Sequence, residues 1–543
     1  MPGFPSPEPR ARRARLITGA ALAMAAVAAT ACVAQTAGTA RADTTSGTPR
    51  TPTVRTDAAE SKVQTSITWG ACPPLAKGAT RNPAQKCGTV TVPLDYRRPA
   101  GKTITIEVSE LATAKPGKKH GYLLLNPGGP ALEGLDMPST MAPTLPASVL
   151  DKYDLIGFDP RGVGVSTPMS CGLPGGFGGL FPYPAADGSI TQNIVQAKAA
   201  AKDCGKIGNE LQYFTTANTA RDMNRIRQAL GVQKISYWGQ SYGTYLGAVY
   251  ATLFPQHTDR MILEGAVDPN DVWQKQIQLW NQGMNDRFPD AARVAAADNA
   301  QLGLGSTIPQ VTRTFLALAS QLDKAPVAIP GANLSLNGAL LREVTYELLL
   351  HNTTLTTLTQ FWKASADLSA GKTLTAADAA ALQQAFADLN SPGPVSANVP
   401  ADNQASMTLA LICGDASWPR NVASYAAATA AARARYPLSD GMPDNVWPCA
   451  FWSKAPIEPP VRVTSHGPRD ILILQNRRDN ATPWAGALGM AQALGRRAAF
   501  VGVDNGGHYV YGTDSSCADR ATVAFLVYGT LPAKPVYCPA PKS

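Results

Sequence analysis

Short apolar runs recur along the chain and predict buried strands. Residues 87–94 and 103–108 alternate between apolar and polar positions, which is typical of strands with one buried face. Six later runs are continuously apolar, as expected of strands that are buried on both faces of a parallel sheet. These runs are residues 121–126, 153–159, 234–239, 260–265, 470–475 and 499–503.

Helical periodicity follows several of these runs. Residues 219–230 carry apolar side chains at helical spacing, and a second helix is expected over 242–254. Buried strands that alternate with helices predict the α/β class. We expect a mostly parallel central sheet that is flanked by helices and joined by right-handed crossovers.

The alternation of strands and helices lapses within residues 272–460. This region is rich in alanine and leucine and is mostly helical, for example over 340–350 and 376–389. We therefore expect one α/β domain, formed by residues 67–271 and 461–543, which is interrupted by a helical cap insertion over 272–460.

The first 42 residues have the pattern of a secretory signal peptide. Four arginines precede an uncharged stretch over 16–34, and Ala40-Arg41-Ala42 offers an A-x-A cleavage site. Residues 43–66 are rich in threonine, alanine and serine and predict a flexible lead-in. We expect the protein to be secreted to the extracellular space. The alternatives are an uncleaved anchor helix and a cell-surface lipoprotein attached at Cys32.

Composition and charge exclude several classes of protein. The 543 residues carry a formal net charge of +9, and removal of the five arginines and one glutamate of residues 1–42 lowers it by 4 to +5. No run of lysine or arginine indicates nucleic-acid binding. The 47 glycines and 44 prolines follow no period, which excludes a collagen-like or wholly disordered chain. We expect no stable membrane insertion after signal cleavage.

Eight cysteines follow the signal segment, and an even number in an exported protein predicts disulfides. Eight cysteines allow 105 connectivities, but these form four sequential pairs with modest gaps, so we expect neighbours to pair. The expected disulfides are Cys72–Cys87, Cys171–Cys204, Cys413–Cys449 and Cys517–Cys538. No C-x-x-C motif occurs and the histidines do not cluster with cysteines, so we expect neither a metal nor a cofactor.

A G-x-S-x-G motif at residues 239–243 marks the candidate nucleophile, Ser241. The motif follows a predicted strand and opens a predicted helix, which is the context in which a strained turn projects the serine hydroxyl above the sheet. The helix N-terminus beneath the serine favours developing negative charge. The alternative is a glycine-rich tight turn without chemistry.

A serine nucleophile needs a base, and in this context the chain order is serine, acid, histidine. The histidines are His120, His257, His351, His466 and His508. Only His508 follows a late strand. The acid should lie just beyond the preceding strand, where Asp479 lies, and its carboxylate would orient the imidazole. Asp504 is the rival acid, but four residues from His508 it is too close along the loop.

The oxyanion needs two backbone N–H donors. One should come from Tyr242, the residue after the nucleophile. The second should come from residues 126–130, Asn-Pro-Gly-Gly-Pro. The two prolines have no N–H, so Gly129 or Gly128 must donate, and we favour Gly129.

Together these motifs resemble the secreted bacterial tripeptidyl aminopeptidase family of α/β hydrolases, which are related to proline iminopeptidase. The resemblance spans residues 69–538. It rests on residues 87–96 (CGTVTVPLDY), 126–130 (NPGGP), 157–164 (GFDPRGVG), 218–222 (NTARD), 239–247 (GQSYGTYLG), 479–483 (DNATP) and the closing segment between Cys517 and Cys538. It implies the α/β-hydrolase fold and an exopeptidase that releases tripeptides from peptide substrates with a free N-terminus. It carries Ser241, Asp479 and His508 over as the triad.

One stretch departs from the family pattern. After Asn-Pro-Gly-Gly-Pro the family usually continues Gly-Gly-Ser-Gly, whereas this chain has Ala-Leu-Glu-Gly at 131–134. Bulkier side chains beside the oxyanion loop would narrow the site, or Glu133 would place a carboxylate near the substrate. The departure concerns the preferred substrate length rather than the hydrolytic chemistry.

A cap over the nucleophile would exclude folded proteins and should supply a carboxylate for the desolvated substrate ammonium. Asp415 is the leading candidate for this carboxylate, with Glu264 and Glu133 as alternatives. The competing interpretation is that Asp415 caps a helix that begins near Trp418.

Two other functions use the same sequence features. An esterase or another small acyl hydrolase would need the same serine, histidine and acid, since the choice of peptide over ester rests on the family resemblance alone. A catalytically inactive hydrolase serving as a binding protein is the third hypothesis, which the intact triad residues disfavour.

Overall fold

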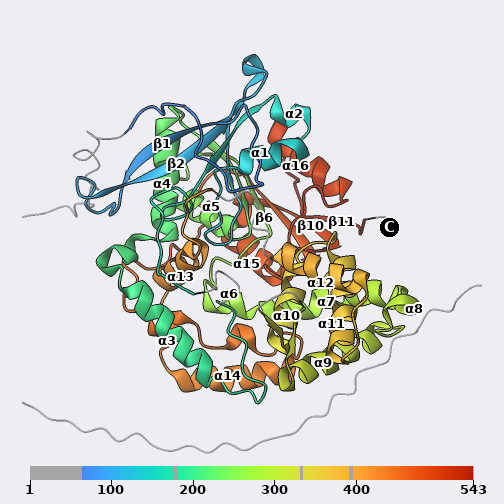
Figure 1. Ribbon diagram of the computed structural model, residues 1–543. Coiled ribbons are helices and arrows are strands. Elements are labelled where there is room, and N and C mark those ends of the chain that lie inside the picture. Colours follow the sequence, from blue (N-terminus) through green and yellow to red (C-terminus); the bar gives the residue numbers. More distant parts are fainter. Residues whose placement is uncertain (1–63, 175–179, 331–333, 390–395, 542–543) are drawn as a thin grey trace, which may run out of the picture. The chain divides into compact units, whose positions relative to one another are not determined.

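The computed structural model describes residues 64–174, 180–330, 334–389 and 396–541 (Figure 1). The predicted signal peptide and most of the predicted lead-in lie outside the described residues. Within the described ranges, no helix has both the length and the apolar character that crossing a membrane requires.

A nine-stranded sheet forms the centre of the fold, in the order β1-β2-β4-β3-β5-β6-β9-β10-β11. β1 pairs antiparallel with β2 and β2 with β4, whereas all later neighbours pair in parallel. The prediction of a mostly parallel sheet is therefore confirmed. The strands are β1 (Lys86–Pro93), β2 (Thr103–Leu111), β3 (Gly121–Asn126), β4 (Tyr153–Phe158), β5 (Ile235–Gln240), β6 (Thr258–Glu264), β9 (Ile471–Arg478), β10 (Ala498–Gly506) and β11 (Val536–Cys538).

Successive apolar residues of the central strands point to opposite faces, and both faces are covered. On β9, Ile471 and Ile473 belong to the apolar core that also contains side chains of the helices α4 (Thr216–Ala229) and α5 (Tyr242–Leu253). Leu472 and Leu474 belong to a second apolar core, which contains side chains of α16 (Ser516–Tyr528) and of the short helices α1 (Met137–Met141) and α2 (Ala147–Leu150). Burial on both faces explains why these strands are continuously apolar in the sequence.

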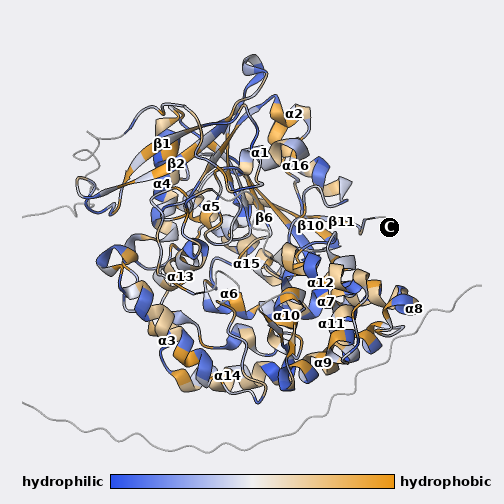
Figure 2. Ribbon diagram, in the orientation of Figure 1, coloured by the Kyte–Doolittle hydropathy of each residue, from blue (hydrophilic) through white to orange (hydrophobic). Residues whose placement is uncertain are grey.

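The insertion between β6 and β9 is helical apart from the short hairpin β7 (Val327–Ala328) and β8 (Ser335–Leu336). Its helices are α6 (Gln274–Gln278), α7 (Trp280–Ala297), α8 (Asn299–Leu302), α9 (Ile308–Lys324), α10 (Gly338–Leu348), α11 (Leu355–Ser369), α12 (Ala376–Leu389), α13 (Asn403–Asp415) and α14 (Val422–Arg435). Helices α7 to α12 enclose an apolar core of their own around Phe288, Phe315 and Trp362. In Figure 2 these helices carry both hydrophobic and hydrophilic residues, as expected of helices with one buried face.

The helical layer also includes a segment from the first half of the chain. Helix α3 (Thr191–Gly205), between β4 and β5, packs on the 3₁₀ helix Pro448–Phe451 near the end of the insertion. The alternation of strands and helices assigns residues 67–271, and with them α3, to the α/β domain. It does not predict that α3 packs on the insertion.

Four disulfides join the neighbouring cysteines in the predicted order. They are Cys72–Cys87, Cys171–Cys204, Cys413–Cys449 and Cys517–Cys538. Each loop is short, and closing a loop removes conformational entropy from the unfolded chain. The first and last of these disulfides lie near the two ends of the described chain, where fraying is otherwise expected.

We expect the mature protein to contain no free thiol, because all eight cysteines after the signal segment are paired. Thiol titration of the denatured, unreduced protein should give a value near zero, and titration after reduction should give eight per chain. Two or more reactive thiols before reduction would contradict this expectation.

Candidate active site

Ser241 occupies the one-residue turn between β5 and α5, with φ 55° and ψ −123°. A positive φ is strained for a residue other than glycine. The two motif glycines make room for this turn. A Cβ on Gly239 would collide with the carbonyl oxygen of Gly243, and a Cβ on Gly243 would lie 2.7 Å from Oδ1 of Asn126. The steric demands of the turn therefore account for the G-x-S-x-G pattern.

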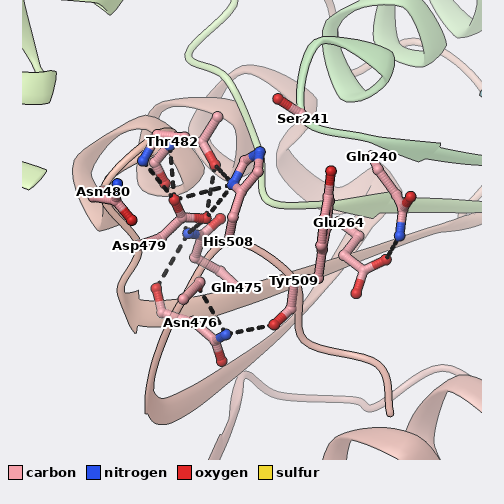
Figure 3. Close-up of polar contacts among 12 residues, drawn as sticks. Gln240, Ser241, Glu264, Gln475, Asn476, Asp479, Asn480, Thr482, His508 and Tyr509 are labelled. Carbon is pink, nitrogen blue, oxygen red and sulfur yellow. Dashed lines mark hydrogen bonds and ion pairs between the residues drawn. The ribbon is translucent and has the colours of Figure 1, made fainter. Parts of the chain in front are cut away.

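Backbone contacts fix the strained turn in place. The N–H of Ser241 donates to the carbonyl of Glu264 at 2.9 Å. The carbonyl of Ser241 accepts from the N–H of Thr244 at 2.9 Å and from its Oγ1 at 2.6 Å. The Ser241 side chain makes no hydrogen bond to the described residues and remains partly exposed, so its hydroxyl is accessible (Figure 3).

The Asn-Pro-Gly-Gly-Pro loop lies directly against Ser241. A Cβ on Gly128 would collide with the carbonyl of Gln240 and would lie 2.9 Å from Cβ of Ser241. The N–H of Gly128 donates to Oδ1 of Asn126 at 3.1 Å, so it is already used. The N–H groups of Gly129 and Tyr242 have no acceptor in the described part of the chain. These two donors are the ones that the sequence favours for the oxyanion.

His508 follows β10 and pairs with Asp479, which follows β9. Its Nδ1 lies 2.9 Å from Oδ2 and 3.1 Å from Oδ1 of Asp479. Figure 3 shows the imidazole ring between Asp479 and Ser241. Gly265 lies close to the imidazole ring, since a Cβ at this position would lie 3.3 Å from Cε1 of His508. No hydrogen bond joins Ser241 to His508 in this structure, and such contacts often tighten only with substrate bound.

The carboxylate of Asp479 is almost fully buried and is held by several donors. Its Oδ1 accepts the N–H groups of Ala481 and Thr482, both at 2.9 Å. Its Oδ2 accepts the hydroxyl of Thr482 at 2.9 Å. The sequence pattern assigns no role to Thr482. Its position three residues after Asp479 nevertheless places its hydroxyl within reach of that carboxylate. These contacts leave the carboxylate facing the imidazole.

The rival acid, Asp504, lies elsewhere. It is exposed and pairs with Arg478, whose Nη1 is 2.6 Å from Oδ1 of Asp504. Arg478 also donates to Asp290 on α7 at 2.9 Å. Asp504 therefore belongs to an ion-pair network at the protein surface, and it makes no hydrogen bond to His508.

Electrostatics around His508 favour the protonated ring. Burial opposes the charge, but the ion pair with Asp479 and the nearby carboxylates of Glu264 and Glu347 outweigh it, so the pKa of His508 is raised above its ordinary value of 6.5. A raised pKa makes the ring a stronger base toward the serine hydroxyl.

This raised pKa predicts the acid limb of the pH–rate profile. His508 must be neutral to accept a proton, so kcat/KM should fall as the pH drops through the raised pKa of the ring. The midpoint of the acid limb should therefore lie above pH 6.5, measured on any substrate that does not titrate in this range. A midpoint at or below 6.5 would contradict the expectation.

Asp415, at the end of α13, is buried and fully engaged. Its Oδ1 accepts the N–H of Thr216 at 2.8 Å, and its Oδ2 accepts the Thr216 hydroxyl at 2.6 Å and Nε1 of Trp273 at 3.1 Å. Thr216 Oγ1 also bonds the Tyr242 hydroxyl at 2.8 Å. Burial raises the pKa of Asp415 to about 6. The cavity beside it measures about 10 Å³, about the space of one water molecule.

Asp415 therefore caps a helix, but a different one from that expected. It bonds the first turn of α4, far away in sequence, whereas α14 begins only at Val422 and is capped by Asn421. The expectation of a helix that begins near Trp418 is wrong. Proline at position 419 and the extended backbone at Ala416 keep residues 416–421 out of the helix.

Glu264 also lacks free acceptor capacity. Its Oε1 accepts the N–H groups of Val510 at 2.8 Å and Tyr511 at 2.7 Å. Its Oε2 accepts Nε1 of Trp238 at 2.9 Å and Nε2 of Gln240 at 2.8 Å (Figure 3). These four donors tie the end of β6 to β5 and to the segment after His508.

Glu133 lies on the oxyanion side and contacts the insertion. Its Oε2 accepts the N–H of Ser396 at 2.8 Å, and burial raises its pKa. All three carboxylates that the sequence nominated for the substrate ammonium are thus bonded to protein donors. The described residues also contain no group of three His, Cys, Asp or Glu side chains that would hold a metal ion.

Comparisons with known proteins find relatives over most of the chain. Residues 121–515 match the family model described as alpha/beta hydrolase fold. A tripeptidyl aminopeptidase of Streptomyces lividans is 33% identical over 500 residues, which cover 89% of this chain and 88% of the relative. The serine protease Hip1 of Mycobacterium tuberculosis is 29% identical over 510 residues, 89% of this chain and 93% of that protein. Carboxylesterase B of the same species is 30% identical over 489 residues, 87% and 89% of the two chains.

Proposed function

Since this chain belongs to the α/β-hydrolase family and is a serine peptidase related to the tripeptidyl aminopeptidases, we propose that it releases tripeptides from peptides with a free N-terminus. The relationship to the tripeptidyl aminopeptidases carries the choice of a peptide substrate. The Asp479–His508 pair beside the strained Ser241 supports hydrolysis by a serine nucleophile. We also propose that the protein is secreted, which the four disulfides support.

The proposed mechanism assigns one role to each residue. His508 takes the proton of the Ser241 hydroxyl as Oγ attacks the scissile carbonyl, and the N–H groups of Tyr242 and Gly129 stabilise the oxyanion. His508 then gives the proton to the leaving amine, which leaves an acyl-enzyme on Ser241. Water, deprotonated by His508, attacks the ester, and the released serine recovers its proton. Asp479 stabilises the imidazolium throughout.

Contacts of the insertion with the loops around Asp479 and His508 support action on chain ends rather than on folded proteins. Nε1 of Trp280 on α7 donates to the carbonyl of Ala481 at 2.8 Å. The N–H of His508 itself donates to the carbonyl of Leu350, just after α10, at 2.7 Å. A helical layer bound this closely to both loops restricts the approach of large substrates.

The test is a panel of p-nitroanilides with one, two or three residues and with free or acetylated N-termini, assayed beside a p-nitrophenyl ester. The proposal expects the highest kcat/KM on free tripeptidyl substrates. Efficient cleavage inside a folded protein would contradict the role of the insertion.

An esterase is the second candidate, which the relationship to carboxylesterase B favours. It would hydrolyse the ester and none of the peptides. An inactive binding protein would hydrolyse neither.

A further inference from the structure

The end of α10 and the residues just after it are bound to the two loops that carry Asp479 and His508. The carbonyl of Leu350 accepts the N–H of His508 at 2.7 Å, and the carbonyl of Tyr346 accepts Nδ2 of Asn480 at 2.9 Å. Glu347 lies between these two anchored positions. Its charge acts on His508, since it contributes to the raised pKa of that ring. The contacts of Tyr346 and Leu350 therefore hold the segment that carries Glu347 against the loops of Asp479 and His508.

Glu343 lies one turn before Glu347, so the two side chains share one face of α10. Neither carboxylate has a hydrogen-bond or ion-pair partner in the described ranges, and both keep part of their surface accessible. Burial raises the pKa of Glu343 to about 8 and that of Glu347 to about 7, and the charge of Glu347 contributes to the first shift. The nearest cation along the helix, Arg342, pairs instead with Asp323 at 3.0 Å.

A third polar group comes from the same part of α10. Tyr346 is 5% exposed, and its hydroxyl has no partner among the described residues. Burial raises the pKa of Tyr346, and the nearby charges of Glu347 and Asp479 raise it further. Its ring packs against Trp280 at 5.3 Å between centroids. Two unpaired carboxylates, an unpaired hydroxyl and aromatic rings form a site that suits an organic cation with several N–H donors.

We propose that Glu343, Glu347 and the Tyr346 hydroxyl bind the free α-ammonium group of the peptide substrate. This proposal rests on the proposed peptidase function and names the residues that recognise its substrate. An ammonium group supplies three donors and one positive charge, which match the two carboxylates and the hydroxyl. Anchoring the ammonium at a fixed place relative to Ser241 sets how many residues fit between them. Three extended residues span about 10 Å.

The contrast with the other carboxylates supports this choice. Asp415 and Glu264 accept three and four hydrogen bonds from protein donors, so a substrate ammonium would have to displace them. A carboxyl group buried without a partner is costly in its charged form. The entering ammonium group would favour that charged form and would donate a strong hydrogen bond to it.

The test compares Glu343→Gln, Glu347→Gln and the double variant with the unchanged mature protein. The substrates are a free tripeptidyl p-nitroanilide, its N-acetylated form and a p-nitrophenyl ester. We expect kcat/KM on the free peptide to fall by about 30-fold or more, mainly through KM, because an ion pair is lost. For Glu343→Gln, turnover of the acetylated peptide and of the ester should stay within about twofold of the unchanged protein. Glu347→Gln also removes a charge that raises the pKa of His508, so its effect is expressed as the ratio of kcat/KM on the free peptide to kcat/KM on the acetylated peptide, measured at a pH above the acid limb of the pH–rate profile. Asp367→Asn on α11, a carboxylate already paired with Lys363 and Lys372, is the matched control.

Direct binding separates recognition from chemistry. In a Ser241→Ala background, calorimetry should show that a free tripeptide binds and that Glu347→Gln weakens this binding, while the acetylated tripeptide binds equally weakly to both proteins. Unchanged kcat/KM on the free peptide would overturn the proposal, and so would an equal loss on the ester, which would indicate a general effect on His508. If the unchanged protein cleaves the ester but no peptide, the proposed function itself fails.

Discussion

Replacement of Ser241 by alanine is expected to lower kcat/KM by about 10⁶-fold, because the proposed nucleophile is lost. Folding should be unaffected. The contacts that hold this turn come from the backbone N–H and carbonyl of residue 241, and alanine retains both. The hydroxyl has no partner among the described side chains whose loss would destabilise the fold.

Hydrolysis of the best substrate from the p-nitroanilide panel, measured beside the melting temperature, checks this expectation. The variant should melt within about 2 °C of the unchanged protein. Residual activity within tenfold of the unchanged protein, after contamination is excluded by active-site titration, would refute Ser241 as the nucleophile.

Replacement of Asp479 by asparagine is expected to lower kcat by about 10⁴-fold. Asparagine fills the same space and keeps one oxygen for the N–H groups of Ala481 and Thr482. Its amide nitrogen, however, would donate to Nδ1 of His508. The imidazole would then carry its proton on Nε2, the nitrogen that must accept the proton of Ser241.

Asp504→Asn is the matched control, because Asp504 is the other acid near His508 in sequence. Its partner is Arg478 rather than the imidazole, so kcat should change by less than about threefold. A loss at Asp504 as large as that at Asp479 would reverse the assignment of the acid. The Asp479 variant should also lose the raised acid limb of the pH–rate profile, since the charge that raises the pKa of His508 is gone.

The central strands could be predicted from the sequence because burial on both faces leaves an uninterrupted apolar run. The strand expected over 121–126 is β3 with the same bounds. β11 escaped prediction because its three residues are too few to establish a pattern. Helix α4 begins at Thr216, earlier than expected, because Thr215 caps it through a hydrogen bond from the N–H of Asn218 at 3.3 Å.

Ser241, Asp479 and His508 could be proposed as the triad from the sequence because local strand-to-loop context and chain order constrain where such residues lie. The hydrogen-bond partners of the buried carboxylates could not be predicted from the sequence. Asp415 bonds Thr216, which is 199 residues away, and no local pattern in the sequence signals that contact. Glu343 and Glu347 fall within a correctly predicted helix. Their proposed role in substrate binding depends on the packing of that helix on the loops of Asp479 and His508. Helical periodicity in the sequence does not predict this packing.

The docking of α10 has a consequence for building chimeras from related hydrolases. The carbonyl of Leu350 accepts the backbone N–H of His508, and the side-chain amide of Asn480 donates to the carbonyl of Tyr346. An insertion grafted from a relative that does not reproduce this turn would leave a buried N–H beside the histidine unsatisfied, at a cost of about 1–3 kcal/mol. Transplanting the insertion to alter specificity therefore requires that the loops after β9 and β10 be exchanged together with it.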